Sequence, residues 1–193
     1  MDNIEKMQDI EEKIFNLILS AEFFNNYTIE MNNLCKNCSN GRKIFTIHSN
    51  IYFRYVLSVL KTLFEYPSKP NEQSFSLWRK EKNEQISEEV NDFKRISDLY
   101  EKSDLKKFRN KIIDHRESKN AGDVLANFLN PVAGAHTENA KKIINKLKDH
   151  AKKYFIEETV SDFISFYKTD MDKFKIFLME KYNYQKIKDK NQQ

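Results

Sequence analysis

Apolar residues recur at intervals of three and four along most of the chain, which is the spacing of one face of an α-helix. The pattern predicts a first amphipathic helix over about 3–25 and a polar loop over about 25–43. A second helix is expected over about 44–65, with apolar residues on more than one face: Ile47, Ile51, Tyr55, Val56, Val59, Leu60 and Leu63. A helix of this kind is typical of the centre of a bundle.

Residues that cap helices indicate where the next ones begin. Ser74 is expected to open a short helical turn in which Trp78 is a packing anchor. Ser87, followed by two glutamates, has the pattern of an N-cap and an acidic first turn. Ser103 is a second capping signal, and it is expected to start a helix over about 104–117.

The C-terminal part of the chain predicts two longer helices. A break over 118–122 and one or two turns over 123–129 precede them. Thr137 is expected to cap the first, and the second covers about 159–182 with an apolar face of Phe163, Phe166, Tyr167, Met171, Phe174, Phe177 and Leu178. We expect one domain over 1–184, with mostly antiparallel neighbouring helices, and a frayed lysine-rich tail over 185–193.

Composition supports an all-α fold and limits the functions. Three glycines and three prolines in 193 residues leave few tight turns, so a many-stranded sheet is not expected. The net charge of +4 is too small to mark a nucleic-acid-binding protein by itself. We expect no leader and no membrane span, because no basic-then-apolar N-terminus and no apolar run of about 18 residues is present. Two cysteines favour the reduced cytoplasm.

Neither a metal nor a cofactor is expected. Cys35 and Cys38 have the spacing of metal ligands, but zinc takes about four ligands and only His48 is a nearby third. We therefore interpret the two cysteines as an inert pair in a loop. His136 is expected just before a helix, and His150 is expected to face solvent among lysines. No glycine-rich phosphate loop is present.

The segment 108–117 carries the candidate chemistry. Leu105, Phe108 and Ile112 form an apolar stripe, and Arg109 and His115 border it from opposite edges, about 120° apart. Arginine binds phosphate oxygens, and histidine transfers protons near neutral pH. We expect both side chains at the rim of the contact made by this stripe. The alternatives are structural: Arg109 would pair with a carboxylate such as Glu65 or Asp104, and His115 would lie at a packing edge.

Four further basic residues on this segment are candidate contacts for an RNA backbone: Lys106, Lys107, Lys111 and Arg116. The alternative is that they form a solvated face of a lysine-rich protein.

The string RNKIIDHRE resembles the motif of the HEPN superfamily, in which an arginine, a following polar residue and a histidine lie four to six positions apart. The likeness is closest to the U-type abortive-infection branch, and it covers Arg109, Asn110, Lys111 and His115. The chain departs from that branch at Asp114, where alanine is usual, and at Glu117, where aspartate is usual. A weaker similarity lies upstream, from Asn50 to Pro67 and from Ser74 to Leu77.

The resemblance implies an all-α HEPN-like bundle of about five main helices that forms a homodimer in which two motif helices meet. It implies metal-independent cleavage of RNA, with Arg109 and His115 as the catalytic pair and Asn110 as an orienting residue. Single-stranded RNA would be the substrate, an antitoxin protein a further partner, and toxicity or phage defence the role. The alternative is a non-catalytic member that serves as a dimerisation or protein- or RNA-binding module.

Overall fold

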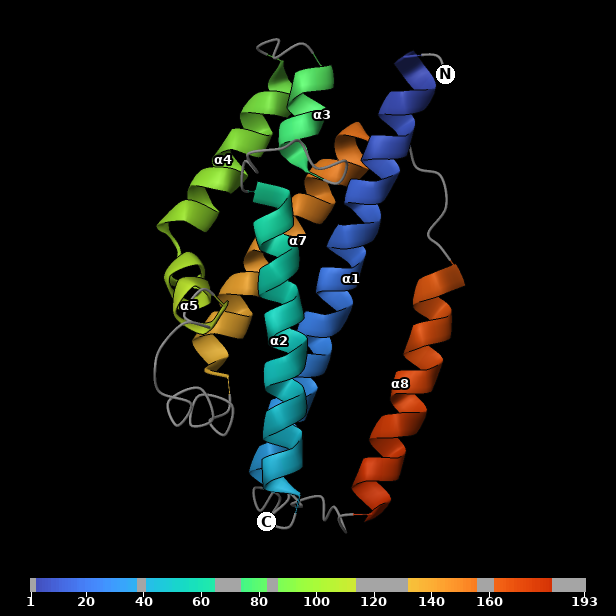
Figure 1. Ribbon diagram of the computed structural model, residues 1–193, viewed down its shortest axis with the longest axis vertical. Coiled ribbons are helices and arrows are strands. Elements are labelled where there is room, and N and C mark those ends of the chain that lie inside the picture. Colours follow the sequence, from blue (N-terminus) through green and yellow to red (C-terminus); the bar gives the residue numbers. More distant parts are fainter. Residues whose placement is uncertain are drawn as a thin grey trace, which may run out of the picture.

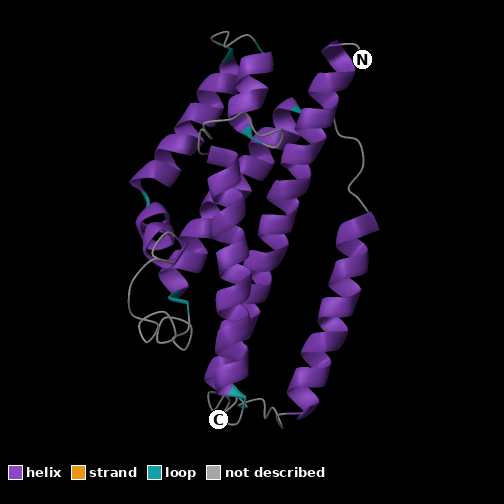
Figure 2. Ribbon diagram, viewed as in Figure 1, coloured by secondary structure: helices purple, strands orange, loops and turns teal. Residues whose placement is uncertain are grey.

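The computed structural model describes residues 3–37, 41–64, 74–82, 87–113, 132–155 and 162–181. Over these residues the chain forms seven helices and no strand (Figures 1 and 2), so the prediction of an all-α protein is confirmed. The helices are α1 (Asn3–Asn37), α2 (Arg42–Phe64), α3 (Phe75–Glu81), α4 (Glu88–Lys102), α5 (Asp104–Ile113), α7 (Gly134–Tyr154) and α8 (Asp162–Lys181).

The helices α1 and α2 run antiparallel and form the axis of the bundle, and α7 crosses behind them (Figure 1). As predicted, α2 is central, since it packs on α1, α3 and α5 and buries residues such as Phe53, Leu57 and Leu60. The burial expected for the apolar residues of this helix was wrong for Ile51 and Tyr55, which are 47% and 40% exposed. Both lie on the outer face of α2, where the Tyr55 hydroxyl donates to Ser20 Oγ.

The loop predicted over 25–43 is wrong, because α1 continues as a helix to Asn37. Two of its asparagines, Asn25 and Asn32, are buried and bond to other helices and to the chain before α7. Asn25 donates to the Thr137 carbonyl over 3.1 Å, and Asn32 donates to the Val132 carbonyl over 2.9 Å. Ser49 of α2 donates to Asn32 Oδ1 over 2.6 Å. These bonds satisfy both ends of the Asn32 amide and the nitrogen of the Asn25 amide, while Asn25 Oδ1 has no partner among the described residues, so a polar stretch serves as an interior helix.

Two of the predicted caps are confirmed. The Ser74 side chain accepts a hydrogen bond from Leu77 N, and the Ser87 side chain accepts one from Val90 N. The hydroxyl of Ser103 instead donates to the Tyr100 carbonyl over 2.6 Å and so closes the end of α4. Thr137 is not a cap either. It lies inside α7, which begins at Gly134, and its hydroxyl donates to the Gly134 carbonyl.

An aromatic cluster joins α3, α4 and α7. Trp78 is fully buried, as predicted, and its ring lies 5.7 Å from that of His150 and 5.7 Å from that of Phe155. The expectation that His150 faces solvent was wrong. The side chain is 4% exposed, and Nε2 lies 2.8 Å from the Glu89 carbonyl oxygen. Burial lowers the pKa of His150 below its ordinary value.

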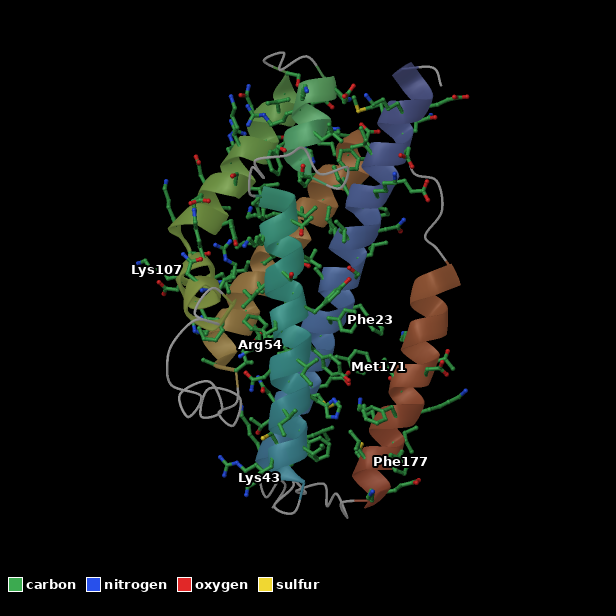
Figure 3. All side chains as sticks on the ribbon, in the orientation of Figure 1. Phe23, Lys43, Arg54, Lys107, Met171 and Phe177 are labelled. Carbon is green, nitrogen blue, oxygen red and sulfur yellow. The ribbon has the colours of Figure 1, made fainter. Side chains whose placement is uncertain are left out.

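The helix α8 lies beside α1 and runs in the same direction (Figure 1). Phe23 of α1 and Met171 of α8 point into the space between the two helices (Figure 3). Polar contacts add to the attachment, since Tyr27 donates to Asp172 over 2.7 Å and Lys175 pairs with Glu30. Of the predicted apolar face, Met171, Phe174 and Leu178 face the bundle. Phe177 does not, because it is 53% exposed.

Several predicted features lie outside the described residues: 114–117 at the end of the motif segment, the break at 118–122, the turns at 123–129 and the tail at 185–193. The side chains of Ile112, Phe163, Phe166 and Tyr167 are likewise not described. Among the helices that are described, none combines the length and apolar character needed to cross a membrane.

Candidate functional site

Arg109 lies on α5, in the motif segment, and its side chain is buried with 4% exposure. Nη1 donates to the hydroxyl of Tyr100 on α4 over 3.4 Å, and Nη2 donates to Asn110 Oδ1. The predicted position at a rim is therefore wrong. The stripe packs as expected, with Leu105 fully buried and Phe108 against the core. Because the Tyr100 hydroxyl lies in that core, a polar partner for the guanidinium is present below the surface.

Asn110 is exposed and still accepts a hydrogen bond from Arg109. The two residues are sequence neighbours, so the bond folds the guanidinium back over its own helix. Asn110 Oδ1 and the Tyr100 hydroxyl accept from different guanidinium nitrogens, and together they hold the planar group in one orientation. This contact is the kind that an orienting residue makes.

Three predicted site residues and one suggested partner of Arg109 fall wholly or partly outside the described residues. His115 and Arg116 lie outside the described residues, as does Glu65, one of the two carboxylates suggested as a partner of Arg109. Lys111 lies on α5, but its side chain is not described. The other suggested partner, Asp104, has Lys107 Nζ 3.9 Å from its Oδ1.

Lys106 and Lys107 project from α5 next to Arg109, and Lys107 points away from the bundle (Figure 3). Lys106 pairs with Glu101. In the pair of Lys107 with Asp104 both side chains are more than 70% exposed. An ion pair at such exposure contributes little and exchanges readily, so Lys107 remains available to a phosphate.

His136 lies beside the motif helix, which the sequence did not indicate. It belongs to the first turn of α7, and its ring is stacked on that of Phe108, with centroids 4.1 Å apart and an interplanar angle of 27°. Its Nδ1 is buried and has no hydrogen-bond partner among the residues that the structure describes. No local spacing links positions 108 and 136, so only the packing of α5 on α7 reveals this contact.

Cys35 is part of α1 rather than of a loop, and its thiol is buried. The sulfur lies 2.8 Å from Thr46 Oγ1 and 3.2 Å from the Arg42 carbonyl oxygen. Cys38 lies outside the described residues. His48, suggested as a third ligand, packs instead against Tyr52 and Phe174, and burial lowers its pKa. No group of metal-binding side chains occurs within the described ranges.

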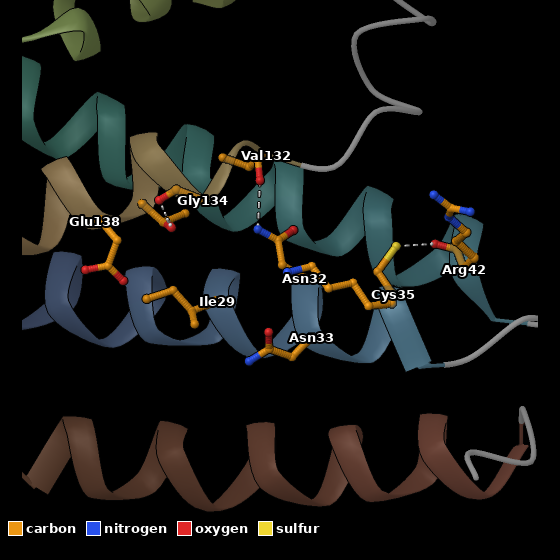
Figure 4. A pocket seen from close by; sticks show the side chains of 10 residues that line it. Ile29, Asn32, Asn33, Cys35, Arg42, Val132, Gly134 and Glu138 are labelled. Atoms are coloured by element: carbon orange, nitrogen blue, oxygen red, sulfur yellow. Dashed lines mark hydrogen bonds between the residues drawn. The ribbon is translucent and has the colours of Figure 1, made fainter. Parts of the chain in front are cut away.

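Cavities also open between the described helices, and two of these do not include Arg109. The larger, of about 380 Å³, lies between the C-terminal part of α1 and the start of α7 (Figure 4) and is lined by residues such as Ile29, Asn32, Cys35 and Glu138. The second, of about 320 Å³, lies between α4 and α7. There Asp92 accepts from Tyr154 over 2.7 Å, and this bond is the main cause that holds the pKa of Asp92 below its ordinary value.

Comparisons of this chain with models of known protein families, with curated proteins and with solved structures find no match.

Proposed function

We propose that this protein is a HEPN-like endoribonuclease that cleaves single-stranded RNA without a metal, as a cytoplasmic homodimer that acts as a toxin or in phage defence. The observation that carries the proposal is the hydrogen bond from Arg109 to Asn110 on the helix that carries RNKIIDHRE. It joins two neighbouring residues of the motif in the roles that the resemblance implies, a phosphate-binding guanidinium and the amide that orients it. The HEPN-like bundle, the RNA substrate and an antitoxin partner are parts of the same proposal.

The proposed reaction uses the RNA's own 2′-hydroxyl. His115 takes its proton while the 2′-oxygen bonds to phosphorus, and the bond from phosphorus to the 5′-oxygen breaks. Arg109 stabilises the negative charge that gathers on the phosphoryl oxygens. The leaving 5′-oxygen takes a proton from solvent water, and the products carry a 2′,3′-cyclic phosphate and a 5′-hydroxyl. Lys106, Lys107, Lys111 and Arg116 bind flanking phosphates.

The test is cleavage of a labelled single-stranded RNA in EDTA by wild type, His115→Ala and His48→Gln. His48 is the matched control, because it lies on the α8 side of the bundle, away from α5. We expect cleavage by wild type and by the control, and a loss of about 100-fold or more in the His115 variant. A substrate with a single 2′-deoxy position should not be cut there. Cleavage of that bond would contradict the 2′-hydroxyl route.

A second candidate function, a non-catalytic HEPN-fold dimerisation or binding module, is favoured by one observation. Arg109 is 4% exposed and donates to the buried hydroxyl of Tyr100, which is a contact that stabilises a core. In that case expression of the protein leaves growth unchanged, and Arg109→Lys lowers the midpoint of thermal unfolding. For the nuclease, expression slows growth and His115→Ala relieves the effect.

A further inference from the structure

The outer face of α8 carries an exposed stripe in which two apolar residues lie between two residues of opposite charge. Ile176 and Phe177 are 55% and 53% exposed, and Lys173 and Glu180 are exposed on either side of them. At about 100° per residue these four positions fall within about 100° of one another on the helical wheel. The face that packs on the bundle, with Met171, Phe174 and Leu178, lies on the opposite side of the same helix.

The order of residues in this stripe is complementary to itself. When two such helices run antiparallel about a two-fold axis between positions 176 and 177, Ile176 of one faces Phe177 of the other. The same register places Lys173 opposite Glu180, about 5 Å along the helix from the axis, and the symmetry repeats that pair on the other side. The pairing thus buries four apolar side chains between two pairs of opposite charge.

The contacts that these residues make within one copy leave the pairing available. Lys173 Nζ lies 3.6 Å from Asp170 Oδ1 on the same helix, and these side chains are 73% and 57% exposed. Lys181 Nζ lies 5.6 Å from the centroid of the Phe177 ring. Exposed contacts of both kinds are weak and exchange for a better partner at little cost.

We propose that the outer face of α8 is a docking surface for a second copy of this chain, through an antiparallel α8 pair with reciprocal Lys173–Glu180 ion pairs. This surface differs from the proposed meeting of motif helices, because α5 and α8 lie on opposite sides of α1 and α2 (Figure 1). It does not depend on nuclease activity. A single helix pair is a small interface, so the association is expected to depend on protein concentration.

Charge reversal tests the register directly. Lys173→Glu places like charges at both ends of the stripe, and so does Glu180→Lys. Each variant should self-associate more weakly than wild type by a factor on the order of ten in sedimentation velocity of the full chain. A mixture of the two variants places glutamate opposite lysine at both positions. The mixture should therefore associate more strongly than either variant alone.

The apolar centre is tested by Ile176→Ser, with Leu99→Ser on α4 as the matched control, since Leu99 is also exposed, at 45%. The first change should weaken self-association, and the control should not. The proposal is overturned if wild type stays monomeric at every concentration. It is also overturned if a wild-type dimer persists unchanged in both reversal variants or if mixing them gives no gain. A wild type that stays monomeric also contradicts the homodimer of the proposed function, whereas the other two outcomes leave that function, which is tested by RNA cleavage, unaffected.

Discussion

The bundle attaches its two C-terminal helices in different ways. On one side α7 meets α3 and α4 through a continuous aromatic cluster in which Trp78, Phe75 and Phe93 are at most 5% exposed. On the other side α8 lies on α1 and α2 through a smaller cluster, to which α8 contributes the buried Leu178 and the partly buried Met171 and Phe174, and through single polar contacts such as Tyr27 with Asp172. Dense apolar packing makes the first attachment part of the core. The second attachment leaves apolar residues of α8 exposed on its outer face. The same fold therefore contains a buried helix contact and a candidate surface for association.

The largest effect is expected where the α7 attachment is densest. Trp78→Ala removes a fully buried ring and the hydrogen bond from Nε1 to Glu11 Oε1. It also leaves a buried carboxylate, whose pKa is already raised by burial, with one donor fewer. We expect a loss of about 3–5 kcal/mol in the free energy of unfolding, measured by urea denaturation.

The matched control is the same type of change on α8. Phe177→Ala truncates a half-exposed ring and should change the free energy of unfolding of the monomer by less than about 0.5 kcal/mol. Similar losses for the two variants would contradict the contrast between the two attachments.

A smaller effect should appear in the pH dependence of stability. Burial lowers the pKa of folded His150 below the ordinary value, so the unfolded chain takes up this proton first as the pH falls. The stability that neutral His150 contributes to the folded protein is present above about pH 6.5. It is lost as the pH falls from there to the lowered pKa, and the free energy of unfolding then falls by up to about 1.4 kcal/mol per pH unit. Protonation would also place a charge among aromatic rings, near Lys153 as well as near Glu89 and Asp92.

This prediction is checked by urea unfolding at a series of pH values from 7.5 to 5, which is about the range over which histidine titrates. His150→Gln should flatten the profile relative to wild type. His48→Gln, on the α8 side, should flatten it less, because His48 is only half-buried. An unchanged slope in the His150 variant would rule out this histidine as the origin.

The smallest of the three predicted losses of stability is expected at the α8 attachment. Tyr27→Phe removes the hydroxyl that donates to Asp172 but keeps the ring that packs against Phe23. The expected cost is about 1 kcal/mol. Hydrogen exchange should report faster exchange of amides in α8, with little change in α7. Equal acceleration in both helices would show that α8 and α7 open as one unit.

The local sequence pattern was enough to predict where most helices lie and which residues form some of their caps. The spacing of Ile10, Ile14 and Ile18 predicts the buried face of α1, and the hydroxyls of Ser74 and Ser87 cap α3 and α4 as expected. These features depend on neighbours within about four residues, which a single helix already brings together. The likeness of RNKIIDHRE to a nuclease motif is equally local, and it remains the basis of a proposal.

Only the tertiary structure decided which polar residues face inward. Asn25 and Asn32 look like loop residues until the chain at 132–137 supplies carbonyl partners more than 90 residues away. From the sequence His150 is expected to be exposed, but in the structure it is buried because α4 supplies the Glu89 carbonyl. Arg109 is likewise expected at the rim, but it is buried because the Tyr100 hydroxyl lies beneath α5. The hydrophobic pattern determined that helices form and which stripes they bury. A buried polar group, however, is stable only where a distant part of the chain satisfies it, and that partner is set by packing.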